Sequence, residues 1–219
     1  PCTVSDGAGG FFVGYSDYRN GNADIIVQHH DANGNALWAA NGVVVCNNPS
    51  GQNAMAIVPD GSGGAIVLWA DFRLDNLNGD LYAARVNSAG TPVWAANGVL
   101  VCGAAGYNTA VEVAGDLQGG LYVTWEDYRN QMTNGRDIYL QHVTYWGSPS
   151  LGADGLAVCA LPSDASQPDL AVSQNGDAFI VWSDGRADSD IYGQFVSYSG
   201  IPNLAVNGAP ICTATYYQS

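Results

Sequence analysis

The sequence contains no lysine, and its only basic side chains are 6 arginines. Against them stand 20 acidic residues, which give a formal net charge of −14. A chain this acidic is repelled by nucleic acid and by anionic membrane surfaces, so we exclude both as partners. The absence of lysine also removes the residue on which P-loop phosphate binding and Schiff-base chemistry depend.

Other motifs that the chain lacks exclude further classes of function. The chain has no apolar run near the ~18 residues that a membrane span needs, so we expect no membrane insertion. It has no G-x-S-x-G motif, no C-x-x-C pair and no S-x-D-x-G-x-x-W box of the sialidase type. Serine-hydrolase, zinc-ribbon, thioredoxin and sialidase functions therefore have no motif to support them. No signal-peptide pattern begins at Pro1, so we interpret the chain as mature or excised.

One pattern recurs along the whole chain: an apolar run, then Asp-x-Arg, a polar loop, and an Asp that opens a second apolar run. The arginines of the four Asp-x-Arg pairs are spaced by 54, 56 and 57 residues. Repetition at this length is typical of repeat architectures, which are to be sought before any other fold. The repeated charged residues are Asp17, Arg19, Asp24, Asp71, Arg73, Asp80, Asp127, Arg129, Asp137, Asp184, Arg186 and Asp190.

Each repeat divides into four strands separated by turn signals. In the second repeat we expect strands near 54–58, 64–70 and 80–86 and a last one within 91–102, with the turn Pro-Asp-Gly-Ser-Gly after the first. Such units bury their faces only by packing against one another, as in a β-propeller. We therefore predict a single all-β domain over 1–219, a four-bladed β-propeller with four antiparallel strands per blade and about 55 residues per repeat. The repeats are approximately 1–53, 54–108, 109–167 and 168–219.

Closure of such a ring needs a contact between its first and last blades. We hypothesise a Cys2–Cys212 disulfide at this point, and pairing of these thiols with a neighbouring subunit is the alternative. A larger propeller that contains these four blades also stays open. The chain has 5 cysteines, and the four that end repeats, at positions 46, 102, 159 and 212, are interpreted as small buried residues, with covalent modification as the alternative.

The recurring Asp and Arg residues are interpreted as scaffold. A catalytic site needs a unique set of residues, whereas these recur in every blade. We expect the Asp and Arg that end the second strand to form bidentate ion pairs, and to pair with the Asp that opens the third strand.

The loops between Arg and the next Asp vary, with 4, 6, 7 and 3 residues. Variable loops on a fixed scaffold are common binding surfaces, so blades 2 and 3 supply the candidate contact residues Phe72, Leu74, Leu77, Tyr128 and Met132. No cofactor is expected. A calcium ion held by Asp75, Asn78 and Asp80 is the one metal candidate, because their loop offers oxygen ligands in a turn.

The pattern D-G-x-G-G-x-x-x-x-W-x-D-x-R, followed by D-I-Y-x-Q and G-V-x-V-C, resembles repeats of large secreted or surface proteins of bacteria. Matching stretches are 60–73, 137–141, 190–194 and 90–102. The resemblance implies an adhesion, surface-layer or interaction scaffold, and it supplies no catalytic residues. The Asn- and Gly-rich, lysine-free composition favours an extracellular or cell-surface location.

From these observations we expect a non-enzymatic extracellular scaffold that acts through protein–protein contacts, in the form of a self-assembling filament or sheath subunit. Its partners would be copies of itself or other surface proteins. A carbohydrate-binding adhesion module is the alternative, with glycans as partners and aromatic loop residues as the contact. A propeller glycosidase is the third hypothesis, and it requires two carboxylates facing each other across a pocket.

Overall fold

The computed structural model describes residues 1–74, 78–187 and 189–214. Sixteen strands form four antiparallel sheets of four strands, and each sheet consists of strands that follow one another in the chain. The four sheets are the blades of a β-propeller, so the predicted all-β, four-bladed fold is confirmed. The described part of the chain includes one helix, α1 (Gln131–Asn134), and no helix there is long and apolar enough to cross a membrane.

Each blade runs from an innermost to an outermost strand. Blade 1 contains β1 (Cys2–Ser5), β2 (Phe11–Asp17), β3 (Asp24–His30) and β4 (Val43–Cys46). Blade 2 contains β5 (Gln52–Pro59), β6 (Ala65–Asp71), β7 (Asp80–Val86) and β8 (Val99–Cys102). Blade 3 contains β9 (Asn108–Gly115), β10 (Leu121–Asp127), β11 (Asp137–Val143) and β12 (Leu156–Cys159). Blade 4 contains β13 (Ala165–Val172), β14 (Ala178–Asp184), β15 (Asp190–Val196) and β16 (Ala209–Cys212).

In blades 1 to 3 the turn between the two inner strands is held by an aspartate, and in blade 4 by Ser173. In blade 2, Asp60 Oδ1 accepts hydrogen bonds from the backbone N–H of Ser62 at 2.7 Å and of Gly64 at 2.8 Å. A side chain on Gly64 would collide with the carbonyl oxygen of Val86 on β7, so only glycine fits. Asp6 and Asp116 make the same pair of bonds in blades 1 and 3. These turns explain the repeated Asp-Gly signal.

The second strand of each blade has apolar side chains on both faces. In β6, Ala65, Val67 and Trp69 pack against blade 1, whereas Ile66 and Leu68 pack against blade 3. In β10 and β14 the equivalent tryptophans, Trp125 and Trp182, likewise face the preceding blade. A blade therefore buries its surface only between two neighbours, and three such cores join the four blades.

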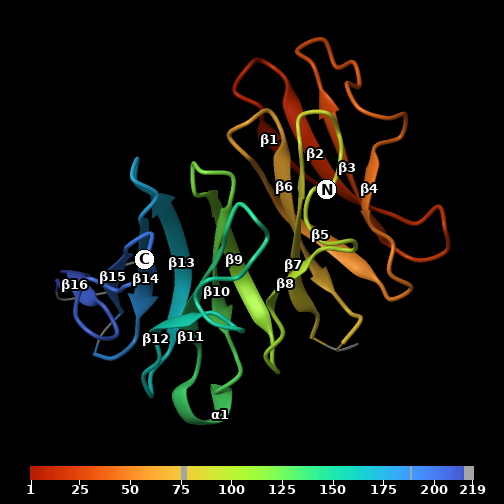
Figure 1. The fold of residues 1–219 in the computed structure, drawn as a ribbon. Helices are drawn as coiled ribbons and strands as arrows, with labels where there is room; N and C mark the ends of the chain where they lie inside the picture. The colour runs from red at the N-terminus through yellow and green to blue at the C-terminus, as the bar shows by residue number, and fades with distance from the viewer. Residues whose placement is uncertain (75–77, 188, 215–219) are drawn as a thin grey trace.

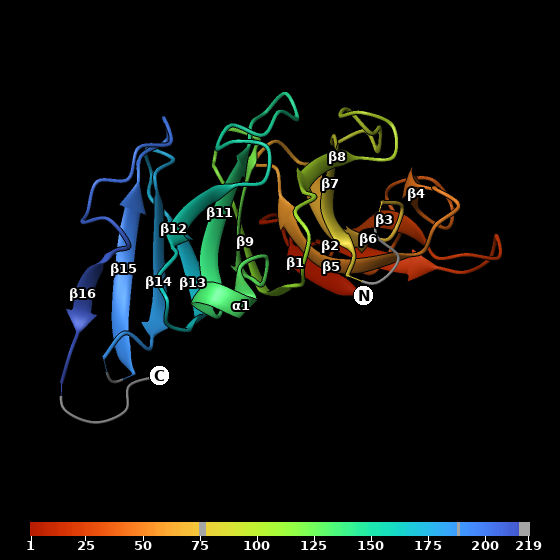
Figure 2. The ribbon, with the colours of Figure 1, turned by 90° about the horizontal axis from the view of Figure 1, so that it is seen from below.

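The blades lie in a row, with blades 1 and 4 at its two ends (Figures 1 and 2). Each inner strand packs against the inner strand of the next blade, and among the described residues no strands of blades 1 and 4 pack together to that extent. The outward faces of the end blades are only partly covered: Phe11 on β2 is 37% exposed and Ile211 on β16 is 55% exposed. The predicted Cys2–Cys212 bridge is not formed, and both residues are free thiols.

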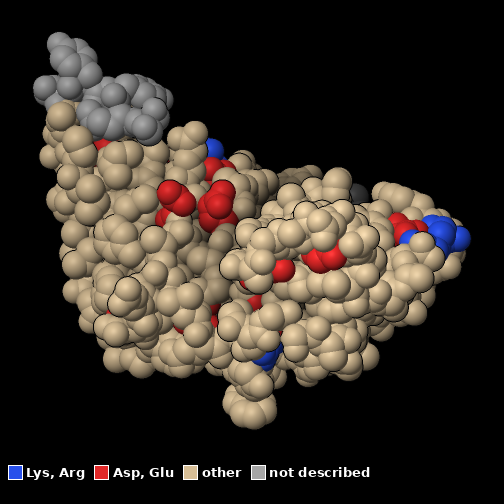
Figure 3. Space-filling model, turned by 90° about the horizontal axis from the view of Figure 1, so that it is seen from above, with Lys and Arg blue, Asp and Glu red and all other residues tan. Residues whose placement is uncertain are grey.

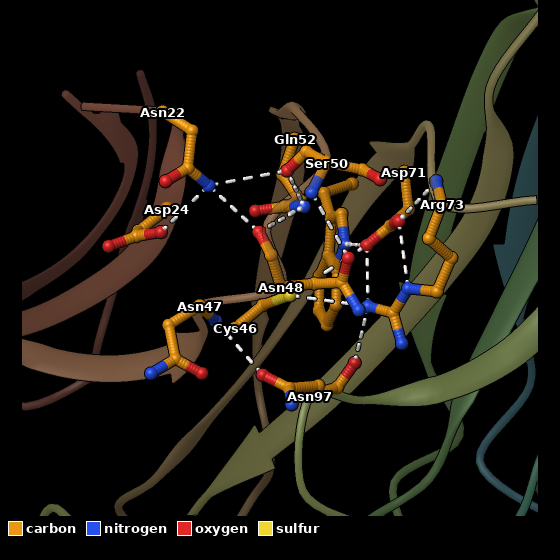
Figure 4. A network of polar contacts seen from close by, with 11 residues as sticks. Asn22, Asp24, Cys46, Asn47, Asn48, Ser50, Gln52, Asp71, Arg73 and Asn97 are labelled. Carbon is orange, nitrogen blue, oxygen red and sulfur yellow. Dashed lines mark hydrogen bonds and ion pairs between the residues drawn. The ribbon is translucent and has the colours of Figure 1, made fainter. Parts of the chain in front are cut away.

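Between neighbouring blades the Asp-x-Arg residues form a contact that we call the Asp–Arg clamp (Figure 4). Arg73 makes a bidentate ion pair with Asp71, with Nε–Oδ1 at 2.8 Å and Nη2–Oδ2 at 2.5 Å. Its Nη2 also lies 3.2 Å from Cys46 Sγ of blade 1 and donates to the carbonyl oxygen of Asn97 at 2.8 Å. The guanidinium stacks on the ring of Tyr82, with Cζ 4.1 Å from the ring centroid.

The clamp repeats at the other two blade junctions. Arg129 pairs with Asp127 and contacts Cys102, and Arg186 pairs with Asp184 and contacts Cys159. The cysteines are buried, and burial raises the pKa of Cys46 and of Cys102 to about 11, so these thiols are neutral at physiological pH. Arg19 pairs with Asp17 but sits at the open end of blade 1, where its side chain is 48% exposed.

Asp24 and Asp137, which open the third strands of blades 1 and 3, bind asparagine side chains rather than these arginines. Asp24 accepts hydrogen bonds from the side-chain amides of Asn20 at 2.8 Å and Asn22 at 3.4 Å. Asp137 accepts from Asn130 and Asn134 in the same way. The arginine turns back to the Asp two residues before it because the backbone turn directly after the strand brings the two side chains together.

We expect Arg129→Ala to destabilise the protein by about 2–3 kcal/mol, because it leaves the buried carboxylate of Asp127 without its ion pair and removes the contact with blade 2. The matched variant Arg19→Ala removes an exposed pair at an end blade, and we expect a much smaller effect. Denaturation midpoints in urea measure both. Equal destabilisation by the two variants would show that the clamp does not stabilise the blade junctions.

Candidate active site on the inner strands

The inner strands of blades 2, 3 and 4 are interrupted at the same place, in blade 2 between Ala54 and Ala56. In the pairing of β9 with β10 the register shifts between Thr124 and Glu126, and in β13 it shifts between Ser166 and Asp169. Ala110 and Gln167, within these bulges, have φ values of 45° and 54°, a left-handed conformation that non-glycine residues rarely adopt. The bulge itself therefore belongs to the repeat, whereas the left-handed residue distinguishes the inner strands of blades 3 and 4 from that of blade 2. Backbone strain of this kind gathers at functional sites, where it redirects side chains.

Glu112 and Asp169 stand directly after the two bulges, at equivalent positions of neighbouring inner strands. Glu112 pairs with Thr124 on β10, and Asp169 pairs with Val181 on β14, the fourth residue of each strand. Both side chains are exposed. Burial by the surrounding protein raises the pKa of Glu112, and the nearby negative charge of Asp169 raises it further. Asp169 is therefore close enough to Glu112 to influence the ionisation of Glu112.

This pair is unique to blades 3 and 4. The equivalent position holds Ala56 in blade 2 and Cys2 in blade 1, as the strand register shows. The two carboxylates thus break the repeat, and neither belongs to the Asp–Arg clamp. A residue that only one junction carries is not needed for blade packing as such.

A third carboxylate, Glu126, ties the two bulges together. It is 5% exposed, and its Oε1 accepts a hydrogen bond at 2.9 Å from the backbone N–H of Gln167. Its Oε2 accepts from Thr109 Oγ1 at 3.1 Å and lies 3.4 Å from Nη1 of Arg136. Gln167 sits two residues before Asp169, so Glu126 holds the backbone that presents this carboxylate.

A pocket of about 180 Å³ opens beside Asp169. It is lined by Gln167, Asp169, Val181, Trp182, Ser183 and Ile191. Figure 3 shows one face of the molecule, on which acidic side chains outnumber basic ones. Several of the acidic side chains lie around the hollow of that face. Asp169 lines this pocket, and Glu112 stands at the equivalent position of the neighbouring inner strand. Two solvent-accessible carboxylates, one of them with a raised pKa, are the kind of pair that acid–base catalysis uses.

The residues predicted to contact a partner differ in exposure, and their role stays a prediction. Met132 on α1 is 97% exposed and Leu74 is 67% exposed, whereas Phe72 packs next to Gly79. Tyr128 lies in the catalytic candidate region instead, with its hydroxyl 3.4 Å from Glu126 Oε2. Leu77 and Asp75 lie outside the described residues, so the calcium candidate with Asn78 and Asp80 stays a prediction.

Solved structures share this fold. The α-L-arabinanase of Penicillium chrysogenum, complexed with arabinobiose, is 14% identical with a TM-score of 0.53, and the match covers 97% of this chain and 68% of that chain. A mutant α-L-arabinofuranosidase of Fusarium graminearum, in complex with an iminosugar inhibitor, is 12% identical with a TM-score of 0.54 and coverages of 96% and 67%. No protein-family model and no curated protein matches the sequence.

At this level of identity the likeness establishes the fold. The four blades account for about two thirds of each of those chains, which extend beyond the matched part. The match also overturns the prediction of a non-enzymatic scaffold. That prediction treated a propeller without a repeated catalytic motif as structural, whereas the two solved structures named above, which share the fold, are an arabinanase and an arabinofuranosidase.

The prediction failed because it looked for chemistry in the residues that repeat. Glu112, Glu126 and Asp169 were missed, although a signal for them was present in the sequence. Blade 2 has Ala56 at the position of Glu112 and of Asp169, and it has Ala70 at the position of Glu126. Comparing repeats for differences, rather than for shared residues, would have selected them.

We expect the side-chain pKa of Glu112 to lie above that of an ordinary glutamate, so that it stays protonated to a higher pH. Asp169→Asn removes one of the two causes and should lower the pKa of Glu112, although burial would keep it above the usual value. Carboxyl ¹³C NMR titration of both proteins measures this. An unchanged pKa in Asp169→Asn would show that the two groups are not coupled.

Proposed function

We propose that this chain carries the catalytic site of a glycoside hydrolase, with Glu112 and Asp169 as its two carboxyl groups. The observation that carries this proposal is the pairing of these residues on neighbouring inner strands, at one blade junction only. The fold supports it, because the solved structures that share this fold include enzymes holding arabinobiose or an iminosugar.

Glu112 suits the role of general acid because its pKa is raised. In its protonated form it donates its proton to the glycosidic oxygen as the bond from that oxygen to the anomeric carbon breaks. Asp169, as a carboxylate, faces the positive charge that develops at the anomeric carbon, and water supplies the oxygen of the new hydroxyl group. The products are two sugars, and the water proton restores the acid.

Glu126 and Arg136 act as positioning residues in this proposal. Glu126 fixes the backbone of Gln167, and Arg136 is held by Glu126 and by Asp164, whose Oδ1 lies 3.4 Å from Nε. The ion pairs keep the bulges of both inner strands in place, so that Glu112 and Asp169 do not have to be ordered when substrate binds.

Arabinose-containing polysaccharides are the first substrates to test, since they are what the named fold relatives suggest. Polysaccharides are too large to enter cells, so an extracellular site of action is part of the same proposal. The net charge of −14 favours neutral over acidic polysaccharides, because a polyanion would be repelled.

We expect hydrolysis of at least one member of a panel containing linear arabinan, xylan, galactan and a chromogenic α-L-arabinofuranoside. Glu112→Gln and Asp169→Asn should each lower kcat by a factor of about 10²–10⁴, the usual contribution of a general acid or base. Reducing-sugar release and chromophore release measure this.

Asp31→Asn is the matched control, because blade 2 carries Asn87 at the same position of the turn. It should leave kcat unchanged. Wild-type rates in both site variants, or a folded protein that cleaves no substrate of the panel, would contradict the proposed function.

A further inference from the structure

A second feature that breaks the repeat lies in the turn after the third strand of blade 3. The turn after the third strand of blade 3 reads Thr144-Tyr145-Trp146-Gly147, and Trp146 is 82% exposed at its tip. The equivalent turns carry Asn33, Ala89 and Ser199 at this position. The fold forms the turn without an aromatic side chain in three blades, so the indole has no structural role that the turn requires.

The turn is fixed firmly on blade 2. Trp94 Nε1 donates to the carbonyl oxygen of Tyr145 at 2.9 Å, and Gly147, with φ of 76°, lies so close over the Trp94 ring that a side chain would not fit. The Tyr145 and Trp146 rings meet edge to face, with centroids 4.9 Å apart. The backbone that carries the exposed indole is therefore fixed before any ligand arrives, and the indole packs on Tyr145.

Beside it opens a pocket of about 230 Å³ at the junction of blades 2 and 3. It is lined by Arg85, Asn87, Val93, Trp94, Tyr145 and Trp146. This volume lies below the range of about 300–1,000 Å³ typical of drug-sized ligands. The pocket therefore suits one small unit of a longer chain.

The polar groups of this pocket are donors. Arg85 is 4% exposed, pairs with Asp60 through Nε at 2.9 Å and Nη2 at 2.8 Å, and stacks under the ring of Tyr145. These bonds leave Nη1 for another acceptor. Asn87 Oδ1 accepts from the backbone N–H of Ala89 and Thr91, which leaves its amide N–H groups to donate.

We propose that Trp146 and this pocket form a secondary binding site for a neutral oligosaccharide, separate from the carboxylates. A sugar ring offers an apolar C–H face for the indole and hydroxyl oxygens for the donors of Arg85 and Asn87. The ion pair with Asp60 neutralises Arg85, and the acidic protein repels anions, so the ligand is uncharged. Trp146 follows Val143, the last residue of β11, which pairs with Leu121. This end of β11 is opposite to the end at which the Asp–Arg clamp lies.

Such a site would hold a polysaccharide on the enzyme while another part of the chain reaches Glu112. Two contacts through one flexible chain raise the effective concentration of substrate at the catalytic site. The choice of polysaccharide as ligand rests on the proposed function, whereas the site itself rests on the geometry around Trp146.

Affinity electrophoresis in gels containing linear arabinan, xylan or galactan tests the site. The Glu112→Gln protein serves as background, so that the polymer is not cleaved during the run. Addition of Trp146→Ala should raise the dissociation constant for the retarding polymer by about tenfold or more, as expected when one large side chain no longer stacks. Trp146→Phe, which keeps an aromatic face, should restore most of the retardation.

Tyr18→Ala is the matched control, because Tyr18 is 71% exposed on a loop of blade 1. It should migrate as the background protein does. Equal retardation with and without Trp146, or no retardation by any of the three polymers, would overturn the secondary site. Retardation that depends on Trp146 in a protein without hydrolytic activity would support the site and contradict the proposed function, so the two failures are distinguishable.

Discussion

The contact between neighbouring blades is the interaction on which the rest of this structure depends. Each blade is apolar on both faces, so one sheet cannot bury its own surface. A tryptophan of the second strand fills the space against the preceding blade, and its indole N–H donates to the same aspartate that anchors the clamp arginine, as Trp69 does to Asp71 at 2.9 Å. Apolar packing and the ion pair therefore fix the same junction, and they place the inner strands side by side.

The residues that hold the blades together are therefore different from the residues proposed to bind and cleave a substrate. The residues that repeat, such as Asp127 and Arg129, are engaged at the blade junctions. The residues that do not repeat are free to differ, and blade 2 shows what the scaffold alone needs: Ala56, Ala70 and Ala89 occupy the positions of Glu112, Glu126 and Trp146 in blade 3. Of these positions, those of Glu112 and Trp146 are exposed, so a repeated fold can vary them without losing the packing between blades.

The repeat of Asp-x-Arg was sufficient to predict the strands and the blades, because period and turn signals are local. Closure was not predictable, since the spacing of Arg19, Arg73, Arg129 and Arg186 does not encode how strongly the row of blades curves. The Cys2–Cys212 hypothesis assumed a closed ring, whereas these residues lie on the inner strand of blade 1 and the outer strand of blade 4. The active-site candidates depend on bulges with Ala110 and Gln167 in a left-handed conformation. Neither residue type favours that conformation, so no local sequence signal indicates it.

The central claim is that Glu112 and Asp169 flank the bond that is cleaved. A crystal structure of Glu112→Gln with an oligosaccharide of the best substrate bound would test it most directly. We predict that the glycosidic oxygen lies within hydrogen-bond distance of the side chain at position 112, with the anomeric carbon facing Asp169. A sugar bound in the structure with its glycosidic bonds out of reach of both residues would contradict the account.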